Sequence, residues 1–118
     1  YAIGRQLTAR YLTGRHPATA LMGVNDMTAL GILAELQSRG CSIPKDFSVC
    51  GFDNIFSAGV TTPALTTIEH HLKARCGAAV NMLIERDSPA HNPMVNKIEY
   101  TPQLMIRGST GPCREQEK

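Results

Sequence analysis

Polar residues stand directly after two short apolar runs, and their types and spacing point to ligand binding. Asn25 and Asp26 follow the run at 20–24, and Asp53 follows the run at 47–52. In open α/β sheets the ligand crevice lies beyond the carboxyl ends of the strands. We therefore expect Asn25 and Asp53 to contact a small polar ligand.

Each of these residues also has a purely structural interpretation. Asn25 is suited to stabilise the end of a strand as a structural amide. Asp26 is suited to cap the next helix by accepting backbone N–H bonds, with a gain of about 1 kcal/mol, and we favour this role over ligand contact. Asp53 and Asn54 together are typical of a turn.

Catalytic and metal chemistry find little support. No Gly-rich phosphate loop follows either apolar run. Three serines lack the strand-turn-helix elbow of a hydrolase nucleophile: Ser48, Ser57 and Ser109. His70 and His71 with Cys76 lack zinc-site spacing, because adjacent histidines do not face one ion. We expect no enzyme activity, no metal and no cofactor.

The elements that position these residues alternate in the first half of the chain. Apolar residues recur at helical spacing over 2–13 and 27–38, which predicts two amphipathic helices. The runs at 20–24 and 47–52 are typical of strands buried on both faces of a parallel sheet. The order predicts an α/β fold with a parallel sheet and flanking helices.

The second half of the chain is less regular. Residues 55–65 show no periodicity, which indicates a loop crossing between layers or lobes. The β-branched segment 66–68 is extended, and a helix then runs to about Arg86. Four residues form its apolar stripe: Leu72, Cys76, Ala79 and Leu83.

The end of the chain carries two strand candidates. A polar loop at 88–96 precedes an alternating segment at 97–101, which predicts a half-buried strand. A further candidate strand lies at 104–107, and we expect the charged tail from Gly108 to be frayed.

The helix at 27–38 has an unusually wide apolar arc. One apolar sector contains Ala29, Ile32, Leu33 and Leu36, and a second contains Met27, Leu30 and Ala34. The residues left for solvent are Thr28, Gly31, Glu35, Ser38 and Arg39. The second sector needs a second partner, either another helix of the domain or another subunit.

Composition excludes several classes. The 118 residues are 42% apolar and 19% charged, enough for one ordinary domain. The net charge of +2 is dispersed, so this chain does not itself read nucleic acid. No apolar run reaches the roughly 20 residues of a membrane span. The four cysteines have no CxxC spacing, as in reduced cytosolic proteins. Because the chain opens at Tyr1 in the middle of an amphipathic pattern, we expect a fragment of a longer protein.

Four linked segments carry a family resemblance. They are Val24 to Gly31 (VNDMTALG), Ile43 to Asn54 (IPKDFSVCGFDN), Thr62 to Ile68 (TPALTTI) and Ile106 to Pro112 (IRGSTGP). In this order and spacing they resemble the C-terminal part of a LacI/GalR-family transcriptional regulator.

The resemblance implies a periplasmic-binding-protein-like, two-lobed effector domain, here incomplete. By analogy, residues 1–64 belong to the C-terminal lobe, residues 65–106 to the N-terminal lobe after a hinge crossover, and residues 107–118 to a returning tail. The helix-turn-helix head that reads DNA in such regulators is not among these residues.

The resemblance also implies site residues. Asn25 and Asp53 match positions that contact the effector, and His70 matches a polar position reaching in from the hinge. Many sugar-responsive relatives have Gln there, so His70 leaves the effector class open between a sugar and a nucleoside-like molecule. The family's homodimer interface corresponds to Met27, Leu30, Ala34 and Ser57.

The implied function is that of an effector-sensing part of a cytoplasmic, dimeric regulator, a repressor in type, without membrane contact. The alternative is a periplasmic sugar-binding protein of a transporter, which uses the same fold. The segments at 62–68 and 107–112 favour the regulator. An enzyme on the same scaffold is the weakest class. Exposed sheet edges and the uncovered sector of the helix at 27–38 predict self-association or aggregation.

Overall fold

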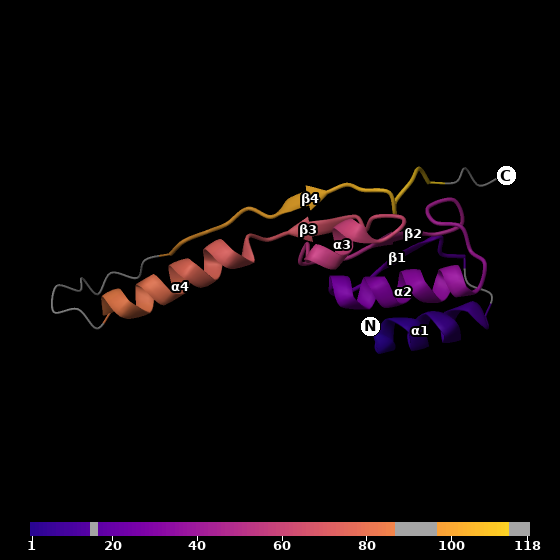
Figure 1. The fold of residues 1–118 in the computed structure, drawn as a ribbon, viewed down its shortest axis with the longest axis horizontal. Helices are drawn as coiled ribbons and strands as arrows, with labels where there is room; N and C mark the ends of the chain where they lie inside the picture. The colour runs from indigo at the N-terminus through magenta and orange to yellow at the C-terminus, as the bar shows by residue number, and fades with distance from the viewer. Residues whose placement is uncertain (15–16, 87–96, 114–118) are drawn as a thin grey trace.

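The computed structural model describes residues 1–14, 17–86 and 97–113. In chain order the elements are α1 (Ala2–Leu12), β1 (Ala20–Met22), α2 (Asp26–Ser38), β2 (Ser48–Cys50), α3 (Phe56–Val60), β3 (Thr67–Glu69), α4 (Leu72–Arg86) and β4 (Gln103–Met105). Figure 1 shows an elongated molecule with α1, α2, β1 and β2 at one end and α4 at the other.

The predicted parallel α/β unit is confirmed. β1 and β2 pair in parallel with Leu21 opposite Val49, and α2 connects them. An isolated parallel bridge between Cys50 and Thr66 extends the pairing on the other side of β2. The prediction that both strands are buried on both faces is wrong. β1 is exposed, half-buried and exposed along its three residues, and in β2 only Val49 is buried, with half-buried residues on either side.

The second sheet pairs β3 with β4 in antiparallel register, with Ile68 opposite Leu104. The candidate strand at 104–107 is therefore confirmed as β4, which begins one residue earlier, at Gln103, and ends at Met105. The predicted strand at 97–101 is wrong, since this segment has no regular structure. It lies against α4 instead, where the Tyr100 hydroxyl donates to the Ala74 carbonyl at 3.4 Å. The loop predicted at 88–96 lies outside the described residues.

Two irregular segments are more ordered than predicted. The loop predicted at 55–65 contains α3, which at five residues is too short to give a periodic signal. The tail was predicted to fray from Gly108, yet Ser109 is fully buried. Its hydroxyl donates to the Val49 carbonyl and accepts the Thr66 N–H, at 2.6 and 2.8 Å. The tail thus closes the free side of β2.

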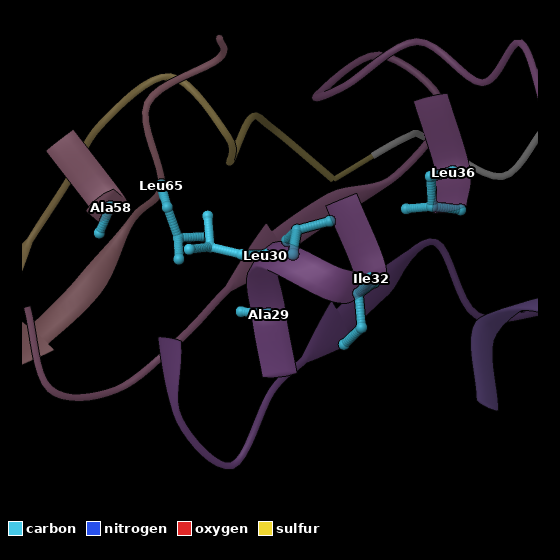
Figure 2. Packing of buried hydrophobic residues seen from close by; sticks show 7 residues of the cluster. Ala29, Leu30, Ile32, Leu36, Ala58 and Leu65 are labelled. Atoms are coloured by element: carbon cyan, nitrogen blue, oxygen red, sulfur yellow. The ribbon is translucent and has the colours of Figure 1, made fainter. Parts of the chain in front are cut away.

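The core lies between α2, β2 and the segment around α3. It consists of Ala29, Leu30, Ile32, Leu36, Val49, Ala58 and Leu65. Figure 2 shows Leu30 of α2 beside Leu65, which precedes β3. Leu30 of the second apolar sector is therefore only 8% exposed within this chain.

Helix α1 covers a face of α2 that was assigned to solvent. Gly31 and Glu35 are buried there, and Arg5 of α1 donates to Glu35 from Nε and Nη2 at 3.0 and 2.9 Å. Glycines allow this approach, because a Cβ on Gly4 would lie 2.2 Å from the Thr28 carbonyl oxygen. Helix α1 therefore packs on α2 outside the apolar arc, through small residues that the apolar pattern does not reveal, while Met27 of the second sector stays 48% exposed.

Helix α4 has its predicted extent and stripe but contributes no buried residue. Leu72 and Leu83 of the stripe are exposed. No helix within the described ranges is long and apolar enough to cross a membrane.

Candidate functional site

Asn25 caps α2, so the assignment of the cap to Asp26 is wrong. Asn25 has extended backbone angles (φ −151°, ψ 169°), and its Oδ1 accepts the Thr28 N–H at 2.8 Å. This is the geometry of a helix N-cap, in which the side chain satisfies an amide of the first turn. The backbone N–H of Asp26 instead donates to the Phe52 carbonyl at 2.7 Å, which brings the ends of β1 and β2 together.

Asp26 is a fully buried carboxylate that joins three segments. Its Oδ2 accepts the Ile55 N–H at 2.9 Å, and its Oδ1 accepts the Thr67 hydroxyl at 2.5 Å. A Cβ on Gly51 would lie 2.3 Å from that Oδ1, so glycine is required for the close approach. The carboxylate fixes the start of α2 to the segment after β2 and to β3.

Asp53 follows β2 in a conformation that L-residues rarely adopt. Its φ is 116°, and its N–H donates to the Ile68 carbonyl at 3.0 Å. The side chain is 36% exposed, and Oδ1 lies 3.2 Å from Nε2 of His70. Within the described residues Oδ2 has no hydrogen-bond partner, so it is an open acceptor at the carboxyl end of the sheet.

His70 is held on three sides. Its ring stacks on Phe52, with centroids 5.2 Å apart and planes inclined by 24°. Its Nε2 faces Asp53, and its Nδ1 lies 2.9 Å from Nη1 of Arg75 in the first turn of α4. The side chain is only 11% exposed. The structure therefore brings Asp53 and His70 together, as the resemblance implied, but joins neither to Asn25 by a hydrogen bond within the described residues.

A polar network that the sequence did not reveal lies beside them. Arg107 donates to the Leu65 carbonyl at 2.8 Å and to Oδ1 of Asn54 at 2.6 Å. Asn54 in turn donates to Oε2 of Glu69 at 2.9 Å, and Oε1 accepts the His71 N–H at 2.6 Å. The bond from Asn54 and then that from His71 hold the pKa of Glu69 below its ordinary value. The network binds the outgoing and returning segments to each other.

The chemistry available at this site is hydrogen bonding. Among the described residues, no group of three or more His, Cys, Asp or Glu side chains could hold a metal ion. Asp53 offers acceptor lone pairs, and on the neighbouring strand end lie the side-chain N–H groups of Asn25, for which the described part of the chain provides no hydrogen-bond acceptor.

The four residues assigned to a dimer surface differ in exposure. Met27 is 48% exposed and Leu30 8%, whereas Ala34 and Ser57 are half-buried. Phe56, next to Ser57, is 85% exposed and was not singled out, because it lies in the segment predicted as an irregular loop.

Comparison with known proteins places this geometry in a family. The family model described as a periplasmic binding protein-like domain matches residues 2–110. The HTH-type transcriptional repressor PurR of Haemophilus influenzae (strain PittEE) is 38% identical over 109 residues, which are 90% of this chain and 32% of that protein. The chain thus spans about a third of the length of this curated relative.

Solved structures agree. A LacI-type transcription regulator from Bifidobacterium animalis superimposes with a TM-score of 0.82 at 34% identity, over 92% of this chain and 39% of that one. A LacI family transcriptional regulator from Enterococcus faecium with bound ribose superimposes with a TM-score of 0.83 at 30% identity, over 94% and 40%. The chain belongs to the family of periplasmic binding protein-like domains found in LacI-type transcriptional regulators.

Proposed function

We propose that this chain is part of the effector-sensing domain of a transcriptional repressor, and that it binds a small polar molecule beside Asp53. One observation carries the proposal. Asp53 is held at φ 116° at the end of β2, with one carboxylate oxygen against His70 and the other open. Such backbone strain, of order 1–3 kcal/mol, is concentrated at ligand sites and switches.

The position of these two residues supports a regulatory role. Asp53 belongs to the end of the first sheet, and His70 to the segment that leaves β3 for α4. We propose the lobe boundaries that the resemblance implies, at 1–64, 65–106 and 107–118. A ligand that contacts both sides of the crossover favours one lobe arrangement over another, and this differential affinity is the basis of allosteric control.

The effector that we propose is a sugar or a nucleoside-like molecule. The bound ribose in the Enterococcus faecium regulator supports this class. Asn25 is part of the proposal, because its Oδ1 is occupied by the cap while its N–H groups have no partner among the described residues.

We further propose a cytoplasmic homodimer that binds DNA through a helix-turn-helix head in another part of the longer protein. The names of the relatives support this reading. The exposed side chains Met27, Phe56 and Val60 supply apolar area for the dimer, to which Ala34 and Ser57 contribute their exposed parts. Leu30 is 8% exposed and packs below this surface.

Calorimetric titration of the full-length protein with ribose, galactose, hypoxanthine and adenosine tests the proposal. We expect one of these compounds to bind, and Asp53→Ala to reduce its affinity by about 10-fold or more. Thr61→Ala is the matched control, because Thr61 is half-buried elsewhere on the same lobe and bonds only locally. Loss of the same affinity in both variants, or no binding of any compound, contradicts the proposal.

Effector-dependent DNA binding separates the regulator from a transport protein. Full-length protein is incubated with labelled genomic fragments, with and without the compound that binds. A change in the amount of retained DNA supports the regulator. Binding of the compound without any retained DNA favours a periplasmic sugar-binding protein.

A further inference from the structure

The contact between Arg75 and His70 determines which ring nitrogen carries the proton. A guanidinium group only donates hydrogen bonds. Nη1 of Arg75 lies 2.9 Å from Nδ1 of His70, so Nδ1 must accept and cannot carry a hydrogen. The hydrogen of the neutral ring is then on Nε2, which faces Oδ1 of Asp53 at 3.2 Å.

The opposite tautomer is disfavoured at both nitrogens. A hydrogen on Nδ1 would point at the Arg75 N–H group, and the lone pair left on Nε2 would face the Asp53 carboxylate. A half-turn flip of the ring would keep its stack on Phe52 but would place carbon atoms opposite Arg75 and Asp53, so both contacts would be lost. The backbone of Arg75 is fixed in the first turn of α4, where its amide N–H donates to the His71 carbonyl at 2.9 Å.

The state of His70 in turn decides which oxygen of Asp53 is left for a ligand. The Nε2–H group occupies Oδ1, which leaves Oδ2 as an acceptor without a hydrogen of its own. A ligand atom that meets Oδ2 must bring the hydrogen. Hydroxyl groups of sugars and N–H groups of heterocycles both do so, whereas a carbonyl or carboxylate oxygen does not.

We propose that Arg75 is a positioning residue that holds His70 as the Nε2–H tautomer, and that this tautomer occupies Oδ1 of Asp53 and leaves Oδ2 for a ligand that presents a hydrogen-bond donor. The selection of ligands rests on the function proposed above. The tautomer does not, because it follows from the contacts of this chain alone. The two parts are therefore tested separately.

Nitrogen-15 NMR of histidine-labelled full-length protein without ligand tests the tautomer. We expect the spectrum of His70, assigned by its loss in His70→Gln, to be that of a neutral ring protonated at Nε2. Arg75→Met removes the donor and should shift this spectrum toward the mixture of an unconstrained histidine. Arg75→Gln retains an N–H donor and should restore it.

Arg86→Met is the matched control, because Arg86 is an exposed arginine at the other end of α4. It should leave the His70 spectrum unchanged. A wild-type ring protonated at Nδ1, or a spectrum that Arg75→Met does not alter, overturns the inference. Arg75 is exposed, so its substitution should not unfold α4. Circular dichroism of each variant checks that the helix is retained.

Titration with the two donor classes tests the preference for a donor at Oδ2. In Asp53→Asn the amide oxygen should face the Nε2–H of His70, so its NH2 group faces the ligand and opposes a donor. We expect about 10–100-fold weaker binding of ribose or hypoxanthine, whichever binds the wild type, and about 3–10-fold weaker binding in Arg75→Met. Equal affinity of Asp53→Asn and wild type overturns the donor assignment. If neither compound binds the wild type, the proposed function fails for these compounds while the NMR result still decides the role of Arg75.

Discussion

The two ends of the molecule contain helices of similar length, α2 with 13 residues and α4 with 15, but the two helices differ entirely in how many residues they bury. Helix α2 buries eight residues against α1, β2 and the segment around Leu65, whereas α4 buries none. The radius of gyration is 19.2 Å, against about 13–14 Å for a compact domain of this length. Figure 1 shows the cause, since α4 extends away from the packed end.

The difference separates what forms a helix from what stabilises it. The 3.6-residue period identifies an apolar face, but most of the stability of a helix in a protein comes from covering that face. α2 has a cap, a buried carboxylate and a closely packed helix beside it. α4 has an apolar stripe that remains exposed, and exposed apolar surface of this kind favours association.

The largest effect should come from truncating one leucine at each end. Leu65 is fully buried and Leu83 is 63% exposed. Leu65→Ala should lower the free energy of unfolding by about 2–5 kcal/mol, and Leu83→Ala by less than about 0.5 kcal/mol. Urea denaturation followed by circular dichroism measures both. A loss for Leu83→Ala comparable to that for Leu65→Ala would show that the stripe of α4 is covered in solution.

A pair of glycines should sharpen the same contrast with changes of opposite sign. A Cβ on Gly4 would meet the backbone of α2, whereas one on Gly77 of α4 has nothing within 4 Å. Gly4→Ala should destabilise by about 1–3 kcal/mol, while Gly77→Ala should stabilise by about 0.5–1 kcal/mol through helix propensity. Thermal unfolding followed at the helical signal measures both. Stabilisation by Gly4→Ala would mean that α1 does not pack on α2 in solution.

Much of the fold could be predicted from the sequence, because the residue patterns that indicate helices and strands are local. Helices α1, α2 and α4, the parallel strands and the stripe of α4 follow from the spacing of apolar residues and from the Gly and Pro residues between them. The burial of Ser109 and the packing of Gly31 depend on contacts distant in the chain, which no period encodes. The strand predicted at 97–101 failed for the same reason, since alternation shows a suitable face but not a partner strand.

The candidate site could be predicted from the sequence only in part. Asp53 and His70 were named from the strand end and the family resemblance, and the structure places them in contact. The helix cap was assigned to Asp26 instead of Asn25, because a one-residue shift of the helix start moves the cap to the neighbouring side chain. Arg75 had no signal in the sequence, since one exposed arginine on a helix resembles any other.

Asn25 offers a smaller effect that separates the cap from the ligand role. Asn25→Ala should lose the bond to the Thr28 N–H and about 1 kcal/mol of stability. Asn25→Ser should retain most of that stability, because serine also caps helices, but it lacks the side-chain N–H groups proposed for the ligand. Thermal unfolding and calorimetric titration of both variants make the distinction. Unchanged affinity in Asn25→Ser would restrict Asn25 to its structural role.

The smallest effect should be the pH dependence of the contact between α1 and α2. Hydrogen bonds from Arg5 and then Arg39 hold the pKa of Glu35 below its ordinary value of 4.5. A lowered folded-state pKa means that the unfolded chain binds the proton more readily, so the stabilisation is present above pH 4.5 and is lost as the pH falls through the folded value. Thermal unfolding from pH 7 down to pH 3 should show this loss, and Glu35→Gln should reduce it. The packed end should therefore lose stability in acid through this contact. An acid response that is equal in wild type and Glu35→Gln would assign it to other carboxylates, Glu69 first among them, since its pKa is also lowered.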